Sequence, residues 1–176
     1  MSTVKIFAGS GSIELAKKIA SEFGKPLGKG KLGKFSDGEL SFRYTETVRG
    51  SDVYIVQSTV DSSDNIMELF LMIDAAKRAS AKFVNVVIPY YVYARQDRKD
   101  NPRIAVSAKL LANLLTASGA SRIVSCDLHA GQIQGFFDIP LDHLNGSSVF
   151  VPYVKNLNLK NPDLQSSIEN LNQKKN

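Results

Sequence analysis

The stretch from Asp127 to Pro140 holds the residue types of this chain that are best suited to chemistry. It follows an apolar run, residues 122–126, that has the composition of a buried strand. In an α/β protein, residues after such a strand lie at the carboxyl edge of the sheet, where these folds bind their ligands. Asp127 and His129 are separated by one residue, so on an extended segment their side chains lie on the same face. This spacing suits the binding of a divalent metal ion or its water shell.

Two further carboxylates, Asp138 and Asp142, follow in the same part of the sequence. Together with Asp127 and His129 they form a candidate ligand set that is rich in oxygen, which favours Mg²⁺ over a softer metal. The spacing matches no standard zinc site. A histidine after a strand can also be purely structural, and the sequence alone leaves that alternative open.

A second polar stretch, residues 91–103, follows another strand-like run. Its charged and amide side chains are Arg95, Gln96, Asp97, Arg98, Lys99, Asp100 and Arg103. Arginine can bind phosphate oxygens through two parallel hydrogen bonds, and neighbouring carboxylates can hold the accompanying Mg²⁺. The alternative is a solvated loop whose charges pair with one another. The chain offers no obvious nucleophile, because its single cysteine lies in an apolar strand pattern and no serine occupies a nucleophile elbow. Transfer between bound substrates through positioning and charge neutralisation is therefore favoured.

The elements that must position these loops alternate between strands and helices. Strands are predicted at residues 4–8, 40–44, 52–57, 83–88 and 122–126, and helices at 12–23, 66–80, 104–117 and 147–157. Ser12 is a predicted helix N-cap, and Asn65 with Glu68 predicts a capping box. The glycine- and lysine-rich segment 28–34 is interpreted as a flexible basic turn rather than a phosphate cradle. This order predicts an α/β fold with a mainly parallel sheet flanked by helices.

Length and composition indicate one domain over residues 1–162 and a polar tail over residues 163–176. The net charge of +5 is spread among acidic residues, which fits an anionic small molecule at least as well as nucleic acid. A single cysteine cannot build a disulfide framework, so we expect a cytoplasmic protein. No secretory signal and no apolar run of ~20 residues is found, so we expect no membrane partner.

With these motifs in view, the chain resembles the ribose-phosphate pyrophosphokinases, also called phosphoribosyl pyrophosphate synthetases. The stretch 127–140 looks like the family signature over its whole length. Further blocks resemble family motifs in the same order, at residues 35–39, 48–50, 64–69 and 93–97. The resemblance implies a phosphoribosyltransferase-like fold, with this chain corresponding to the amino-terminal half of a two-domain family.

The resemblance also implies an activity: the β,γ-diphosphoryl group of MgATP moves to the C1 hydroxyl of ribose 5-phosphate, and AMP is released. Arg95 and His129 would be the catalytic residues, with His129 as a Mg²⁺ ligand and Asp127 supporting that site. Gln96 would contact ATP together with Arg95. Lys99 and Asp100 would lie in the same nucleotide-facing loop.

The resemblance implies a role between subunits for Phe35, Asp37 and Glu39. These residues would reach across an interface to hold the adenine of a neighbour's ATP. We therefore expect a homo-oligomer, or a hetero-oligomer with full-length relatives, and no nucleic-acid partner.

Beyond residue 162 the sequence departs from the family pattern. It lacks a Ser-Pro-Asp-x-Gly-Gly segment, a basic flexible loop and a Thr-Gly-Gly-rich loop for ribose 5-phosphate. The second domain is thus expected to be missing from these 176 residues, and we expect ATP binding with little or no turnover. The alternative is a non-catalytic associated or regulatory subunit. Gly131, His143 and Asn145 also differ from the residues of many relatives.

Overall fold

The computed structural model describes residues 3–60 and 63–158 of the chain. In chain order, the strands are β1 (Val4–Ala8), β2 (Gly30–Lys34), β3 (Leu40–Tyr44), β4 (Asp52–Val56), β5 (Phe83–Ile88), β6 (Arg122–Cys126) and β7 (Leu141–Leu144). The helices are η1 (Ser10–Ser12), α1 (Ile13–Glu22), α2 (Ser63–Arg78), α3 (Ser107–Ser118), η2 (Gly131–Phe136) and α4 (Ser147–Asn158), where η marks a 3₁₀ helix. The chain divides into two units, residues 1–144 and a second unit that begins at Asn145. The predicted domain boundary at residue 162 and the tail 163–176 lie outside the described residues.

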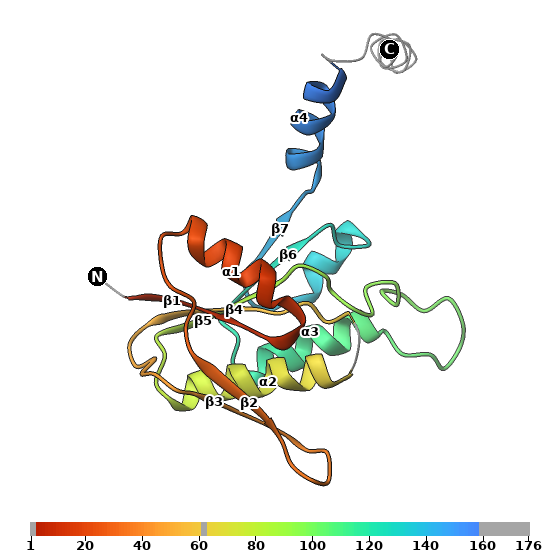
Figure 1. Cartoon of the computed structure of the whole chain (residues 1–176). Helices are drawn as coiled ribbons and strands as arrows, with labels where there is room; N and C mark the ends of the chain where they lie inside the picture. Colours follow the sequence, from red (N-terminus) through yellow and green to blue (C-terminus); the bar gives the residue numbers. More distant parts are fainter. Residues whose placement is uncertain (1–2, 61–62, 159–176) are drawn as a thin grey trace, which may run out of the picture. The chain divides into compact units, whose positions relative to one another are not determined.

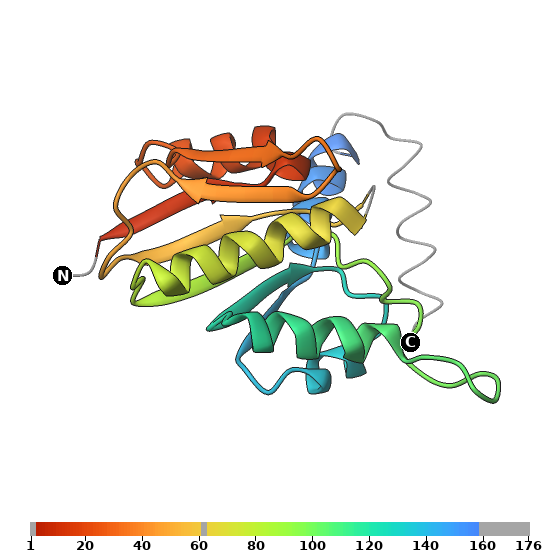
Figure 2. The ribbon, with the colours of Figure 1, turned by 90° about the horizontal axis from the view of Figure 1, so that it is seen from below.

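The first unit is built on a five-stranded sheet in the order β1-β4-β5-β6-β7. All four neighbouring pairs are parallel. Helix α1 lies on one face of the sheet, and α2 and α3 lie side by side on the other (Figures 1 and 2). The predicted α/β fold with a mainly parallel sheet is confirmed.

Alternate residues of each central strand enter different cores. Val53 and Ile55 of β4 are fully buried in the larger core, which also contains Leu69 and Met72 of α2. Val56 belongs to a smaller core with Ala16 and Ala20 of α1. Because both faces are covered, the strand has no polar side to present, which explains its continuous apolar sequence. The two layers fix where each strand ends, and therefore where the following loops begin.

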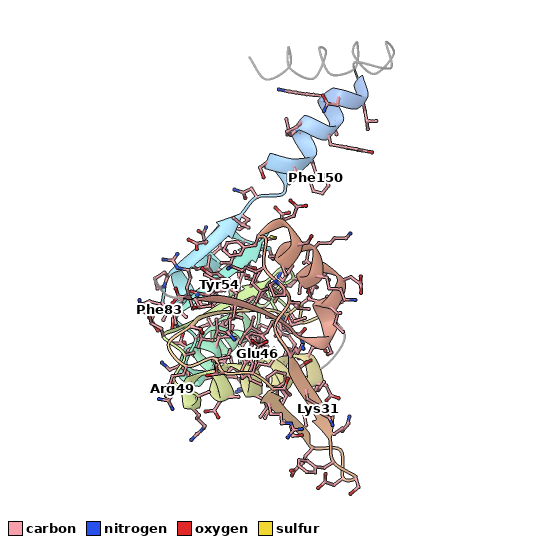
Figure 3. The ribbon with its side chains drawn as sticks, turned by 60° about the vertical axis from the view of Figure 1, so that its left-hand side comes forward. Lys31, Glu46, Arg49, Tyr54, Phe83 and Phe150 are labelled. Carbon is pink, nitrogen blue, oxygen red and sulfur yellow. The ribbon has the colours of Figure 1, made fainter. Side chains whose placement is uncertain are left out.

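The segment 28–34 is not the flexible turn that its composition suggested. Residues 30–34 of this segment form β2, which pairs antiparallel with β3 in a separate hairpin that projects from the sheet. Lys31 on this hairpin is labelled in Figure 3. A Cβ atom on Gly28 would collide with the ring of Phe7, and one on Gly30 would collide with the ring of Phe42. The glycines therefore allow the backbone to pass over aromatic rings, a tertiary contact that local composition does not reveal.

Ser12 is the N-cap residue of α1, as predicted, but its side chain makes no capping hydrogen bond; its Oγ accepts the backbone N–H of Ser58 at 2.7 Å instead. The predicted capping box of Asn65 and Glu68 is wrong. Helix α2 begins at Ser63, ahead of the predicted cap at Asn65. The Glu68 carboxylate lies 2 % exposed, and the distances to its donors are 3.0 Å (Ser10 N–H), 2.5 Å (Ser10 Oγ) and 2.8 Å (Gln57 Nε2). A buried carboxylate with three donors thus links α2 to η1 and to Gln57, the residue that follows β4.

Two other elements differ from the prediction. Strand β7 was not predicted, because its four residues include no β-branched side chain and carry little strand signal. It forms because its backbone pairs with β6 at the sheet edge. Helix α3 begins three residues after the predicted start at Ile104, and it ends as predicted at Gly119, whose φ of 108° terminates the helix.

Helix α4 confirms the helix expected at residues 147–157 and lies in the second unit. Its large apolar side chains are exposed, including Phe150, which is labelled in Figure 3. No helix within the described ranges is long and apolar enough to cross a membrane.

We predict that Glu68→Ala lowers the free energy of unfolding by about 3 kcal/mol, because it leaves the buried Gln57 amide and two donors of Ser10 without their acceptor. Urea unfolding followed by circular dichroism measures this change. Glu22→Ala, which removes an exposed carboxylate at the end of α1, is the matched control and leaves the midpoint unchanged. Equal midpoints for the two variants would show that the buried carboxylate contributes nothing to stability.

Candidate active site

Two loops of the first unit begin side by side because β5 and β6 are parallel neighbours. In their register Ile88, the last residue of β5, is paired with Ser125. The Ser125 hydroxyl donates to the carbonyl oxygen of Ile88 at 2.8 Å, which ties the two strand ends together. The loop after β5 extends beyond the sheet before α3 begins (Figure 2). The loop after β6 is the signature stretch.

Between the two loops lies a cavity of about 410 Å³. Its lining comes from the first loop (Tyr90, Tyr91, Tyr93, Ala94, Arg95 and Gln96) and from the end of β6 with the second loop (Cys126, Asp127, Leu128 and His129). The structure therefore brings together two pairs of candidate residues that are about 30 positions apart in sequence. The first pair is Arg95 and Gln96, and the second is Asp127 and His129. One cavity at the carboxyl edge of the sheet is thus lined by a guanidinium, an amide, a carboxylate and an imidazole.

The first loop is held by side chains that sequence reasoning did not single out. The hydroxyl of Thr59, which is 1 % exposed, donates to the carbonyl of Tyr90 at 2.9 Å and accepts the N–H of Val92 at 3.1 Å. The Tyr91 hydroxyl donates to the carbonyl of Ala108 at 2.8 Å in a buried position, and burial raises its pKa. Tyr91 also packs edge-to-face on Phe137, with ring centroids 5.7 Å apart. The run of tyrosines after β5 is the only sequence signal that could have indicated this anchoring.

The remainder of that loop is partly self-paired. Arg98 and Asp100 form an ion pair of 2.8 Å, and Asp97 accepts a hydrogen bond of 2.6 Å from Gln132 of η2. Lys99 and Asp100 are exposed and do not line the cavity. The alternative of a self-paired charged loop therefore applies to this part of the segment, whereas Arg95 and Gln96 lie on the cavity wall.

Gln96 is the point where the loop meets α3. The Ser107 hydroxyl donates to the side-chain oxygen of Gln96, and the backbone carbonyl of Gln96 accepts the N–H of Ala108 at 3.2 Å. The side-chain nitrogen of Gln96 is left as the group that can face a ligand.

The second loop does not continue the strand as an extended segment. Asp127 has a φ of 42°, in the left-handed region that residues with a side chain rarely adopt. We expected Asp127 and His129 to share a face because the backbone would be extended. The backbone is not extended at Asp127, so this reason is wrong. Both residues nevertheless line the same cavity, since the turn at Asp127 redirects the chain.

The four candidate metal ligands are not gathered in one place. Asp142 lies on β7, where both its oxygens accept hydrogen bonds from Arg122 at 2.9 and 2.7 Å. Asp138 lies 3.7 Å from Lys109 Nζ. Within residues 3–60 and 63–158, no group of three or more histidine, cysteine, aspartate or glutamate side chains could hold a metal. Asp127 and His129 remain as the pair on the cavity wall. This pair fits Mg²⁺ held partly by substrate oxygens and water, as Mg²⁺ sites beside phosphates usually are.

Phe35, Asp37 and Glu39 form the tip of the β2–β3 hairpin and do not line this cavity. The tip is ordered by a 3.1 Å hydrogen bond from the Glu39 N–H to the Asp37 carboxylate and by Gly38, which has a φ of 96°. The Phe35 ring is 59 % exposed. A well-defined hairpin therefore presents an aromatic ring and two carboxylates to the outside of its own unit.

Cys126 lies on the cavity wall, and its pKa is raised, mainly by burial and further by the negative charge of Asp127. Both effects disfavour the thiolate. The raised pKa makes this thiol less reactive as a nucleophile than an exposed one.

A family model described as the N-terminal domain of ribose phosphate pyrophosphokinase matches residues 4–119. The chain belongs to this family. A ribose-phosphate pyrophosphokinase of Chlorobaculum tepidum is 60 % identical over 156 residues, covering 89 % of this chain and 48 % of the relative. That of Porphyromonas gingivalis is 56 % identical over 157 residues, covering 89 % and 50 %.

The solved structures agree with the sequence relatives. The crystal structure of phosphoribosylpyrophosphate synthetase from Mycobacterium smegmatis superposes with a TM-score of 0.86 at 41 % identity. It covers 89 % of this chain and 53 % of that protein. The chain thus spans about half the length of the relatives that it matches.

We predict that iodoacetamide alkylates Cys126 slowly at pH 8, and that the midpoint of the pH–rate profile lies above ~8.5, the usual value for cysteine. Because the pKa is raised, little thiolate is present below that pH. Asp127→Asn removes one of the two causes, so its midpoint moves downward while burial still holds it above the usual value. A wild-type midpoint at or below ~8.5 would contradict the assignment of Cys126 to a partly buried position beside the Asp127 carboxylate.

Proposed function

We propose that this chain supplies the MgATP-binding half of a ribose-phosphate diphosphokinase, a transferase of nucleotide biosynthesis. The whole reaction transfers the diphosphoryl group of ATP to ribose 5-phosphate and releases AMP. The observation that carries the proposal is the convergence of Arg95, Gln96, Asp127 and His129 on one cavity at the carboxyl edge of a parallel sheet. Family membership supports the class of reaction.

Charge neutralisation is the main contribution that these residues can make. The Arg95 guanidinium would bind oxygens of the transferred group through its paired N–H donors and offset the charge that builds up there. Gln96, whose oxygen is already engaged by Ser107, would offer its N–H₂ donors to the nucleotide. Lys99 and Asp100 would stand at the outer end of the same loop.

His129 and Asp127 would hold Mg²⁺ from the opposite loop, and ATP oxygens and water would complete its shell. The bound ion would neutralise phosphate charge. Asp138 and Asp142 are not included in this set, because each lies beside a basic side chain elsewhere.

The adenine would be held by Phe35, Asp37 and Glu39 of a second subunit. Two features support this: the Phe35 ring is exposed on an ordered hairpin, and the three residues lie outside the cavity of their own chain. An aromatic ring stacks on a base, and carboxylates can accept hydrogen bonds from its amino group. We propose a homo-oligomer for this reason, in the cytoplasm, with ATP and ribose 5-phosphate as the small-molecule partners.

We predict that the purified chain binds MgATP, and that Arg95→Ala weakens binding at least about tenfold because a charge-assisted pair of hydrogen bonds is lost. Isothermal titration calorimetry measures the affinity, and protection of Cys126 from alkylation reports occupancy of the cavity. Arg78→Ala, which removes the same charge from an ion pair on α2, is the control and binds normally.

The same preparation, mixed with MgATP and ribose 5-phosphate, tests how much of the reaction this half performs. We expect ATP binding without AMP release, since the chain spans only about half the length of its relatives. Failure of the wild-type chain to bind ATP would refute the proposal.

We predict that mixing two defective variants restores ATP binding, if the hairpin acts between subunits. Phe35→Ala and Arg95→Ala chains each lack one half of every site. In a randomly mixed reciprocal dimer, about a quarter of all sites combine an intact hairpin with an intact Arg95. Calorimetry on the mixture measures this fraction. Recovery of none of the sites would refute the action of the hairpin between subunits.

A further inference from the structure

The turn that carries the two metal-binding candidates is held by a side chain outside the signature stretch. Leu128 lies between Asp127 and His129, and its backbone N–H donates to Nε2 of His143 at 3.0 Å. His143 lies on β7, the edge strand that the sequence did not predict, and is partly buried. It is paired in register with Ser125 of β6, so the β6–β7 pairing sets its distance from the turn.

The backbone at this turn needs such support. The φ of 42° at Asp127 is unfavourable for a residue with a side chain and persists only where surrounding contacts enforce it. The Asp127 N–H donates to the carbonyl of Leu144 at 3.0 Å, and the Leu128 side chain is 8 % exposed. Strand β7 therefore binds two successive amides of the turn. The first bond is between main-chain atoms and tolerates any residue, whereas the second requires an acceptor on the side chain at position 143.

We infer that His143 is a positioning residue, which fixes the Asp127–His129 turn and thereby the direction in which both side chains enter the cavity. The inference rests on the proposed function of that cavity as the MgATP site. If the Leu128 N–H loses its acceptor, the peptide between Asp127 and Leu128 can rotate, and the side chains on either side move with it. Groups that hold metal ligands in position commonly lower the affinity for the metal when they are replaced.

The residue types that can replace His143 follow from the contact. The side-chain oxygen of glutamine reaches about as far from Cα as Nε2 of histidine and is a hydrogen-bond acceptor. Phenylalanine fills a similar volume but has no acceptor. The pair His143→Gln and His143→Phe therefore separates the hydrogen bond from the packing of the ring.

Amide hydrogen exchange followed by NMR tests the contact directly. We expect the Leu128 N–H to exchange at least about fivefold faster in His143→Phe than in the wild-type chain, and within about twofold of it in His143→Gln. Amides of β5 serve as the internal reference, because a general loss of structure would expose them as well. If His143→Phe unfolds, His143→Ala removes the same acceptor without adding bulk. Unchanged protection of Leu128 in the variants without an acceptor would overturn the inference.

MgATP affinity tests the consequence. His143→Phe is expected to bind about fivefold more weakly, and His143→Gln is expected to recover the affinity. Equal affinity of the two variants would refute positioning by the hydrogen bond. If the wild-type chain itself does not bind ATP, the proposed function fails, and amide exchange alone decides whether His143 fixes the turn.

Discussion

The parallel pairing of β5 with β6 is the constraint on which the rest of the first unit depends. Its register sets Ile88 beside Ser125, and the Ser125 hydroxyl closes the contact. Parallel strands must both be followed by loops at the same edge, so the two polar stretches of the sequence meet there whatever lies between them. The pairing is stable because α1 covers one face of the sheet and α2 and α3 cover the other. The cavity is a consequence of layer packing, and its chemistry is a consequence of the residues that follow each strand.

The loops keep their shape through a small number of side chains that carry no chemistry of their own. Thr59 bridges the start of the first loop, and Tyr91 attaches it to α3. On the other side, β7 attaches the Asp127 turn through one main-chain bond and through His143. Irregular backbone in a functional site has few hydrogen bonds within itself, so bonds to the rigid scaffold determine its geometry. Substitutions at these supporting positions would alter the site without touching a ligand.

Two elements carry large apolar side chains that are exposed among the described residues. The hairpin tip presents Phe35 outward, and α4 exposes large apolar side chains such as Phe150. The relatives are about twice the length of the matched region. An exposed ring on an ordered hairpin and a helix with exposed apolar residues are both suited to contacts with another subunit or another domain. The proposed mechanism uses the first of these surfaces and leaves the second without an assigned role.

The sequence by itself determined the fold class, the parallel strands and the two loops that meet at the carboxyl edge, because periodic apolar runs and chain order fix these features. It also selected Arg95, Gln96, Asp127 and His129, which the cavity brings together. Only the tertiary structure decided that β2 and β7 are strands, that Glu68 bonds to Ser10 and Gln57 rather than to a capping partner, and that Asp138 and Asp142 face basic residues elsewhere. The physical reason is common to these cases. A polar side chain or a glycine takes its role from the partner that packing places beside it, and that partner can lie tens of residues away in sequence.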